Sequence, residues 1–81
     1  MKIWKEYFEA VDDESKRFEY RKNDRNFNVG DRLVLCEYDP ITRTYSGRKL
    51  RVEVLYILHV GDYAILSIRR EYREDDTSEN S

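Results

Sequence analysis

The sequence contains few of the residues that bind metals or cross-link small secreted domains. Its 81 residues include one cysteine, Cys36, and one histidine, His59. A single thiol cannot close an internal disulfide, and neither residue stands in a spacing typical of zinc ligands. We therefore predict a protein of a reducing compartment that has no metal site and no cofactor. Cys36 is expected to be a buried small hydrophobe, and His59 to lie at a strand end or on the surface.

Long apolar runs are also absent from the sequence. Hydrophobic residues and charged residues each make up 40% of the chain. No apolar run approaches the roughly 20 residues of a membrane-spanning helix, and the first residues lack the profile of a signal peptide. These features predict a cytoplasmic chain without a membrane partner, folded as one domain with a thin core and a heavily charged surface.

Turn signals are few, because the chain has one proline and three glycines. Between them, apolar residues recur with helical spacing over 2–13 and alternate with polar residues over 17–22, 32–38, 48–60 and 63–69. No helix separates consecutive strands, which favours an α+β fold over a parallel α/β fold. We predict a small curled β-barrel with an N-terminal helix packed against it, and its core should contain Trp4, Phe8, Phe18, Leu33, Leu35, Val52, Val54, Ile65 and Leu66.

Charge is unevenly distributed along the chain. Residues 1–14 carry two cations and five anions, residues 15–70 carry twelve cations and seven anions, and residues 71–81 carry one cation and five anions. A basic body between two acidic ends keeps nucleic acid open as a partner, although the net charge is −2. We expect residues 1–70 to form the domain and residues 71–81 to be an acidic, disordered tail that buries nothing.

The basic segment 16–31 is the candidate binding element. Lys16, Arg17, Arg21, Lys22 and Arg25 fall within ten residues, and aromatic residues stand between them. Since alternate residues of a strand share a face, Glu19 should lie between Arg17 and Arg21. This face is either a surface ion-pair ladder of small energetic value or an edge that recognises a ligand. In the second case Arg21 holds a phosphate, and Glu19 accepts a hydrogen bond from a base or a ribose hydroxyl.

Four segments of the chain carry a resemblance to a known family. They are KIWKEYFEAV at 2–11, KRFEYRKNDRNFNVGDRLVLCEYDP at 16–40, YSGRKLRVEV continuing to LYIL at 45–58, and AILSI at 64–68. Together they resemble the ASCH-related, PUA-like small-barrel family of bacteria and phages, whose nearest branch is a domain of unknown function. The resemblance implies a small β-barrel with an adjacent cleft and an association with RNA. Together with the basic segment, this resemblance predicts a protein that binds RNA or a nucleotide and has no catalytic residue. The predicted binding residues are Lys16, Glu19, Arg21, Lys22 and Arg25.

The resemblance also raises an enzymatic alternative. Some small ASCH proteins are amidohydrolases that act on acetylated cytidine through a lysine, a threonine and a glutamate. Lys16 matches the lysine, but Glu19 stands where the threonine falls, and a carboxylate there supplies neither a hydroxyl nor a thiol nucleophile. The chain also lacks the inserted segment that provides the glutamate, and it has Glu14 and Arg17 where relatives carry glycine and threonine. A further alternative is a phage- or mobile-element-encoded factor that uses the barrel surface to bind a host protein.

Overall fold

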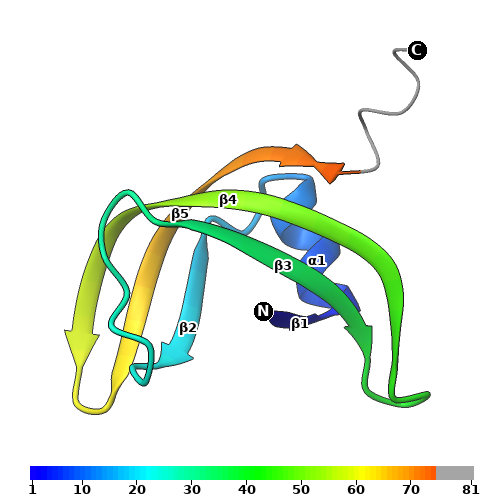
Figure 1. The fold of residues 1–81 in the computed structure, drawn as a ribbon, viewed down its shortest axis with the longest axis horizontal. Coiled ribbons are helices and arrows are strands. Elements are labelled where there is room, and N and C mark those ends of the chain that lie inside the picture. Colours follow the sequence, from blue (N-terminus) through cyan, green and yellow to red (C-terminus); the bar gives the residue numbers. More distant parts are fainter. Residues whose placement is uncertain (75–81) are drawn as a thin grey trace.

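The structure is a computed structural model, and it describes residues 1–74 of the chain. These residues form one curved sheet of five strands with a short helix on its concave side (Figure 1). The strand order in the sheet is β1-β3-β4-β5-β2. The elements, in chain order, are β1 (Lys2–Trp4), α1 (Lys5–Asp12), β2 (Phe18–Lys22), β3 (Arg32–Asp39), β4 (Thr44–Val60) and β5 (Tyr63–Arg73).

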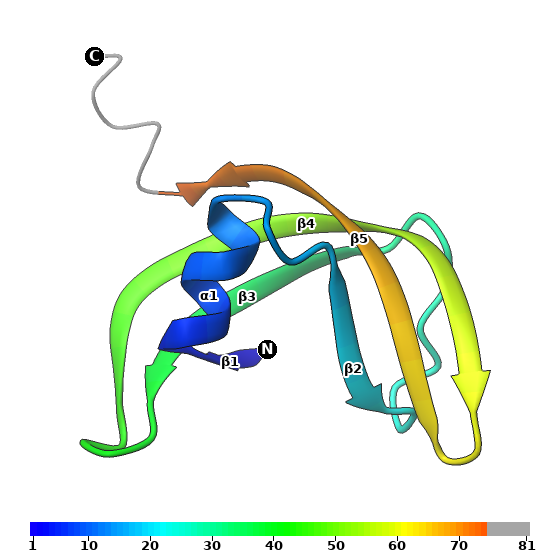
Figure 2. The ribbon, with the colours of Figure 1, turned by 180° about the vertical axis from the view of Figure 1, so that it is seen from behind.

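Strand β4 gives the sheet its curvature. It runs for 17 residues and arches over the helix together with β5 (Figure 2). Its pairing with β5 shifts register between Arg51 and Val52 and again between Val54 and Tyr56. Such bulges bend a strand and increase its twist, so one long strand contributes to both legs of the arch. The predicted curled sheet is confirmed, and its observed shape is a half-barrel.

The N-terminal helix is shorter than the sequence pattern indicated. Residues 2–4 form β1, which pairs in parallel with β3, and the helix begins at Lys5. Over three residues, the alternation of a strand cannot be distinguished from helical spacing. A buried Ile3 fits both a strand and a helix. The helix ends at Asp12, and Glu14 follows in the left-handed region with a φ of 66°. Within residues 1–74, no helix is long and apolar enough to cross a membrane.

The core lies between α1 and the concave face of the sheet. Phe8 and Val11 of the helix meet residues of the three central strands, and Ile3 and Phe27 close the ends. Of the predicted core residues, Phe8, Leu35, Val52, Val54 and Leu66 are confirmed as buried, whereas Leu33 and Ile65 are half-buried.

Trp4 and Phe18 were expected in the core, and this prediction is wrong. They are 46% and 49% exposed. In β1 the inward position belongs to Ile3, so its neighbour Trp4 points outward. In β2 the inward position belongs to Glu19, which pairs with the buried Leu66 of β5. The facing of β2 is therefore the reverse of the one expected.

The last strand is longer than expected. β5 continues to Arg73, beyond its predicted end at residue 69 and beyond the domain boundary placed at residue 70. Charge complementarity holds this extension to the body: Glu71 pairs with Arg32 at 2.8 Å, and Arg73 pairs with Asp12 at 2.9 Å. The prediction of a disordered tail that begins at residue 71 is wrong for residues 71–73, which belong to β5, and residues 75–81 of the predicted tail lie outside the described residues.

Candidate ligand cleft

The two edge strands of the half-barrel, β1 and β2, border a cleft of about 700 Å³. Arg21 on β2 spans it, because its Nη2 donates a hydrogen bond to the carbonyl oxygen of Lys2 on β1 at 2.6 Å. The cleft therefore lies where the sheet would have to close to become a full barrel. Its lining residues come from β1, the first turn of α1, the segment that leads into β2, and β2 itself: Lys2, Ile3, Trp4, Tyr7, Lys16, Phe18, Glu19, Tyr20 and Arg21.

A buried carboxylate with two cations forms the polar part of the cleft. Glu19 is 4% exposed, and its two oxygens accept from Lys16 Nζ at 2.7 Å and from Arg21 Nε at 2.8 Å. Lys16 Nζ also donates to the carbonyl oxygen of Phe18 at 2.6 Å. The three side chains together carry one net positive charge. This cluster presents both a carboxylate acceptor and cationic donors to whatever occupies the cleft.

Aromatic rings surround the charged cluster. Trp4, Tyr7, Phe18 and Tyr20 all line the cleft, and each is about half exposed. Trp4 and Tyr7 stack with their centroids 6.3 Å apart, and Lys16 Nζ lies 4.7 Å from the centroid of Phe18. Exposed flat rings beside cations are the arrangement that accepts a planar, electron-rich group. The sequence analysis missed Trp4 and Phe18 as cleft residues because it assigned both to the core.

The predicted site residues fall into two groups. Lys16, Glu19 and Arg21 converge in the cleft, although the reversed facing of β2 makes their carboxylate buried instead of surface-exposed. Lys22 and Arg25 do not line it: both are exposed, Lys22 at the far end of β2 and Arg25 in the loop that follows. That loop is shaped in part by Asp31, whose Oδ2 accepts from the Asn28 backbone N–H at 2.8 Å.

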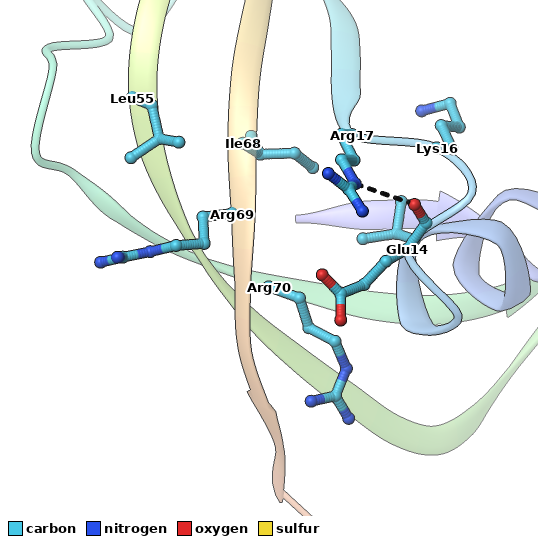
Figure 3. A pocket seen from close by; sticks show the side chains of 8 residues that line it. Glu14, Lys16, Arg17, Leu55, Ile68, Arg69 and Arg70 are labelled. Carbon is cyan, nitrogen blue, oxygen red and sulfur yellow. Dashed lines mark hydrogen bonds between the residues drawn. The ribbon is translucent and has the colours of Figure 1, made fainter.

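A second, smaller hollow of about 280 Å³ lies on the other side of Lys16, which lines both (Figure 3). Two of its arginines are already paired, Arg69 with Glu53 and Arg70 with Asp12. Arg17 donates from Nε to the carbonyl oxygen of Glu14 at 3.0 Å and has no carboxylate partner among the described residues. The complete lining is Val11, Glu14, Lys16, Arg17, Leu55, Ile68, Arg69 and Arg70.

Another buried carboxylate, Glu37, lines neither hollow. It is 7% exposed and accepts two hydrogen bonds from Arg48, at 2.7 and 2.9 Å, and one from Ser46 at 2.5 Å. Arg48 also donates to Glu9 of α1 at 2.6 Å, and its guanidinium lies 4.9 Å from the ring centroid of Phe8. The hydrogen bonds from Arg48 hold the pKa of Glu37 below its usual value, and the two carboxylates raise the pKa of Arg48.

The residues singled out for metal or thiol chemistry are dispersed. No group of three His, Cys, Asp or Glu side chains within residues 1–74 is arranged to hold a metal ion. His59 lies near the end of β4, where its Nδ1 is 3.4 Å from the Asn23 side-chain amide. Cys36 is half-buried in β3, and its sulfur lies 3.9 Å from the amino group of Met1.

Comparisons with known proteins give the chain a family. The profile of the family described as Domain of unknown function (DUF3850) matches residues 1–72. A protein of Escherichia phage P2, described as "Uncharacterized 12.9 kDa protein in GpA 3'region", is 33% identical over 63 residues. The matched region is 78% of this chain and 56% of the phage protein, so the chain covers little more than half the length of that relative.

Proposed function

The chain belongs to the DUF3850 family, and we propose that the cleft between β1 and β2 binds RNA or a nucleotide. One observation carries the proposal: the buried Glu19, held by Lys16 and Arg21, lies in a cleft that is rimmed by half-exposed aromatic rings. A carboxylate, cations and flat rings are the three kinds of group that a nucleotide needs from a protein.

The base is the part of the ligand that the rings and Glu19 suit. An unstacked base can lie on an aromatic side chain, and such stacking contributes about 1–3 kcal/mol per base. Oε1 of Glu19 accepts from Lys16, and Oε2 accepts from Arg21 Nε and also lies 2.8 Å from Arg21 Nη2, whereas an ionised carboxylate has about four acceptor positions. Glu19 therefore retains capacity to accept from the amino or imino N–H of a base while Lys16 and Arg21 stay in place.

The phosphate is the part that the cations suit. The cluster in the cleft has one net positive charge, and the guanidinium of Arg21 is about a quarter exposed. Arg17, in the neighbouring hollow, has no carboxylate partner within residues 1–74 and lies next in sequence to Lys16. A guanidinium can hold phosphate oxygens through two parallel hydrogen bonds. A nucleotide whose base occupies the cleft would place its phosphate between Arg21 and Arg17.

We also propose that the half-barrel is related to the ASCH-type, PUA-like barrels. Lys16, which matches the lysine of that family, converges in the cleft with Glu19 and Arg21. Glu14 occupies the position where those relatives carry glycine, and its φ of 66° is a conformation that glycine adopts without strain. The relation supports RNA over other anionic ligands, because that superfamily is associated with RNA.

Binding of short single-stranded RNA tests the function. Fluorescence anisotropy with labelled RNA would compare the wild type with Arg21→Ala and Arg32→Ala at two salt concentrations. We expect Arg21→Ala to lose about tenfold in affinity, about 1.4 kcal/mol, because it removes a phosphate donor from the cleft. Arg32→Ala is the matched control, since it removes the same charge from an exposed residue outside the cleft.

Arg21 also connects the two sheet edges, so Arg21→Ala could lower affinity by destabilising the fold. A second variant separates the effect on binding from the effect on folding. Trp4→Ala removes a half-exposed aromatic ring from the rim of the cleft. The Trp4 side chain makes no capping hydrogen bond to α1, so its removal leaves the start of the helix intact. We expect it to weaken RNA binding while leaving the thermal midpoint nearly unchanged. Equal affinities for the wild type, Trp4→Ala and Arg21→Ala, or no binding at low salt, would refute the RNA proposal and favour a protein partner instead.

A further inference from the structure

The convex side of the sheet carries a continuous apolar surface near the β4–β5 hairpin. The register places Tyr56 beside Ser67 and Phe18, Leu58 beside Ile65 and Tyr20, and Val60 beside Tyr63 and Lys22. Residues that are directly opposite in antiparallel strands point to the same side of the sheet. These nine residues, hereafter the convex face, form three rows across β4, β5 and β2.

The convex face is exposed. Tyr56 is 64%, Leu58 50% and Tyr20 57% accessible to solvent. The helix lies on the opposite, concave side of the sheet (Figure 2). The rings of Tyr20 and Tyr63 stack at 4.9 Å and give the face a flat centre. Single exposed apolar residues are common, but a contiguous apolar patch of this kind marks an interaction surface.

The chemistry of the convex face limits what can cover it. Lys22 is its one charged residue, and binding of a nucleic-acid backbone requires several cations. Residues 75–81, DDTSENS, contain no apolar side chain that could cover it. An apolar, nearly uncharged, flat sheet surface is instead complementary to another surface of the same kind.

We propose that the convex face packs against the same face of a second copy of this chain, forming a two-fold symmetric dimer. The two sheets would stack about 10 Å apart with their strands nearly aligned, as in a β-sandwich. With aligned strands, a two-fold axis places Lys22 opposite Val60 or Phe18 of the partner subunit, because these residues occupy the neighbouring corners of the face. The arrangement therefore does not bring the two lysines together.

The size of the face sets the strength of the dimer. An aromatic side chain buries about 150–250 Å², and four rings that are half exposed, together with Leu58 and Val60, offer on the order of 500 Å² per copy. Stable interfaces bury about 800 Å² per partner. The dimer should therefore be weak and should dissociate on dilution.

Sedimentation velocity of the full chain over a wide concentration range, without RNA, tests the proposal. We expect the wild type to shift from monomer to dimer as its concentration rises. Leu58→Glu places a charge at the β4 end of the middle row and should raise the dimer dissociation constant at least tenfold. Ile41→Glu is the matched control, because Ile41 is 86% exposed in the β3–β4 turn, away from the convex face. This variant should dimerise like the wild type.

Two results would overturn the proposal. One is a wild type that remains monomeric up to millimolar concentration, and the other is a dimer that Leu58→Glu leaves unchanged. Tyr56→Glu, at the most exposed position of the face, provides a second variant if circular dichroism shows that Leu58→Glu is not folded. Phe18 and Tyr20 belong to both the convex face and the cleft, but Leu58 and Tyr56 do not line the cleft. Sedimentation of these variants without RNA therefore measures self-association separately from RNA binding.

Discussion

Glu19 and Glu37 are the two buried charged residues of the described chain, and their surroundings differ. Both are ionised acceptors held by an arginine, and both lie on the concave side of the sheet. Glu37 of β3 accepts its hydrogen bonds from a different strand, since Arg48 and Ser46 both belong to β4. Glu19 is held by Lys16 and Arg21, which are its near neighbours in sequence, and it lies in an open cleft.

These surroundings make Glu37 part of a structural ion pair and Glu19 a candidate binding group. Arg48 joins Glu37 of β3 to Glu9 of α1 and covers the ring of Phe8, so this network connects the helix to the sheet. The cluster around Glu19 adds little to the connection between distant elements beyond the contact of Arg21 with the Lys2 carbonyl. Lys16 and Arg21 can therefore keep the carboxylate paired while a ligand binds beside them in the cleft.

The largest expected effect comes from breaking the structural network. Arg48→Ala leaves Glu37 buried without its cation and should destabilise the protein by about 2–3 kcal/mol, less than for a fully buried pair because Arg48 is about one third exposed. Urea unfolding would measure the loss. RNA affinity, measured where the variant is folded, should not change. A loss of stability below about 0.5 kcal/mol would remove the structural role assigned to Glu37.

A smaller effect is expected from Glu19→Gln, and its sign is informative. The variant keeps the shape of the side chain but removes the negative charge, so the cleft becomes more positive. If Glu19 only positions Lys16 and Arg21, affinity for RNA should rise. We expect it to fall about fivefold, about 1 kcal/mol, because an amide replaces an ionised acceptor of base N–H groups. Anisotropy titration of both proteins with the same RNA distinguishes the outcomes.

Acid should weaken the network of Glu37. Its pKa is lowered in the folded state, chiefly by the hydrogen bonds from Arg48. A carboxylate with a lowered folded pKa stabilises the protein at pH values above its ordinary value of 4.5, and the contribution is lost as the pH falls through the folded pKa. Glu37→Gln should therefore be less stable than the wild type at pH 7, and the difference should shrink at acidic pH. Thermal midpoints of both proteins across this range would show it, and a difference that does not depend on pH would contradict it.

The sequence predicted the strands in which the alternation of apolar and polar residues is long. The strands at 17–22, 32–38 and 48–60 were found because alternation persists over several residues. β1 was missed because three residues carry too short a pattern. The facing of β2 was reversed because Phe18 and Tyr20 are the apolar residues of that strand, and the burial of Glu19 depends on Lys16 and Arg21 neutralising it.

The site was predictable only where it is local in sequence. Glu19 and Arg21 are alternate residues of β2, so strand alternation brings them to one face. Lys16 precedes the strand and reaches Glu19 from that segment, in the place where alternation predicted Arg17. The contributions of Trp4 and Tyr7 depend on the parallel pairing of β1 with β3, which joins residues that are far apart in the chain. Lys22 and Arg25, which also belong to the basic segment, lie outside the cleft. Proximity in sequence therefore did not identify the cleft by itself.

The smallest expected effect concerns the turn that leads from α1 into the Glu19 cluster. Glu14 has a φ of 66°, a conformation that disfavours residues with a Cβ by about 1–2 kcal/mol, and the backbone freedom of glycine in the unfolded chain offsets part of this. Glu14→Gly should therefore stabilise the protein by about 0.5 kcal/mol, and RNA affinity should be unchanged because Glu14 does not line the cleft. Urea unfolding and anisotropy measure the two quantities. A clear loss of stability would show that the carboxylate of Glu14, which lines the hollow beside Arg17, takes part in holding the turn.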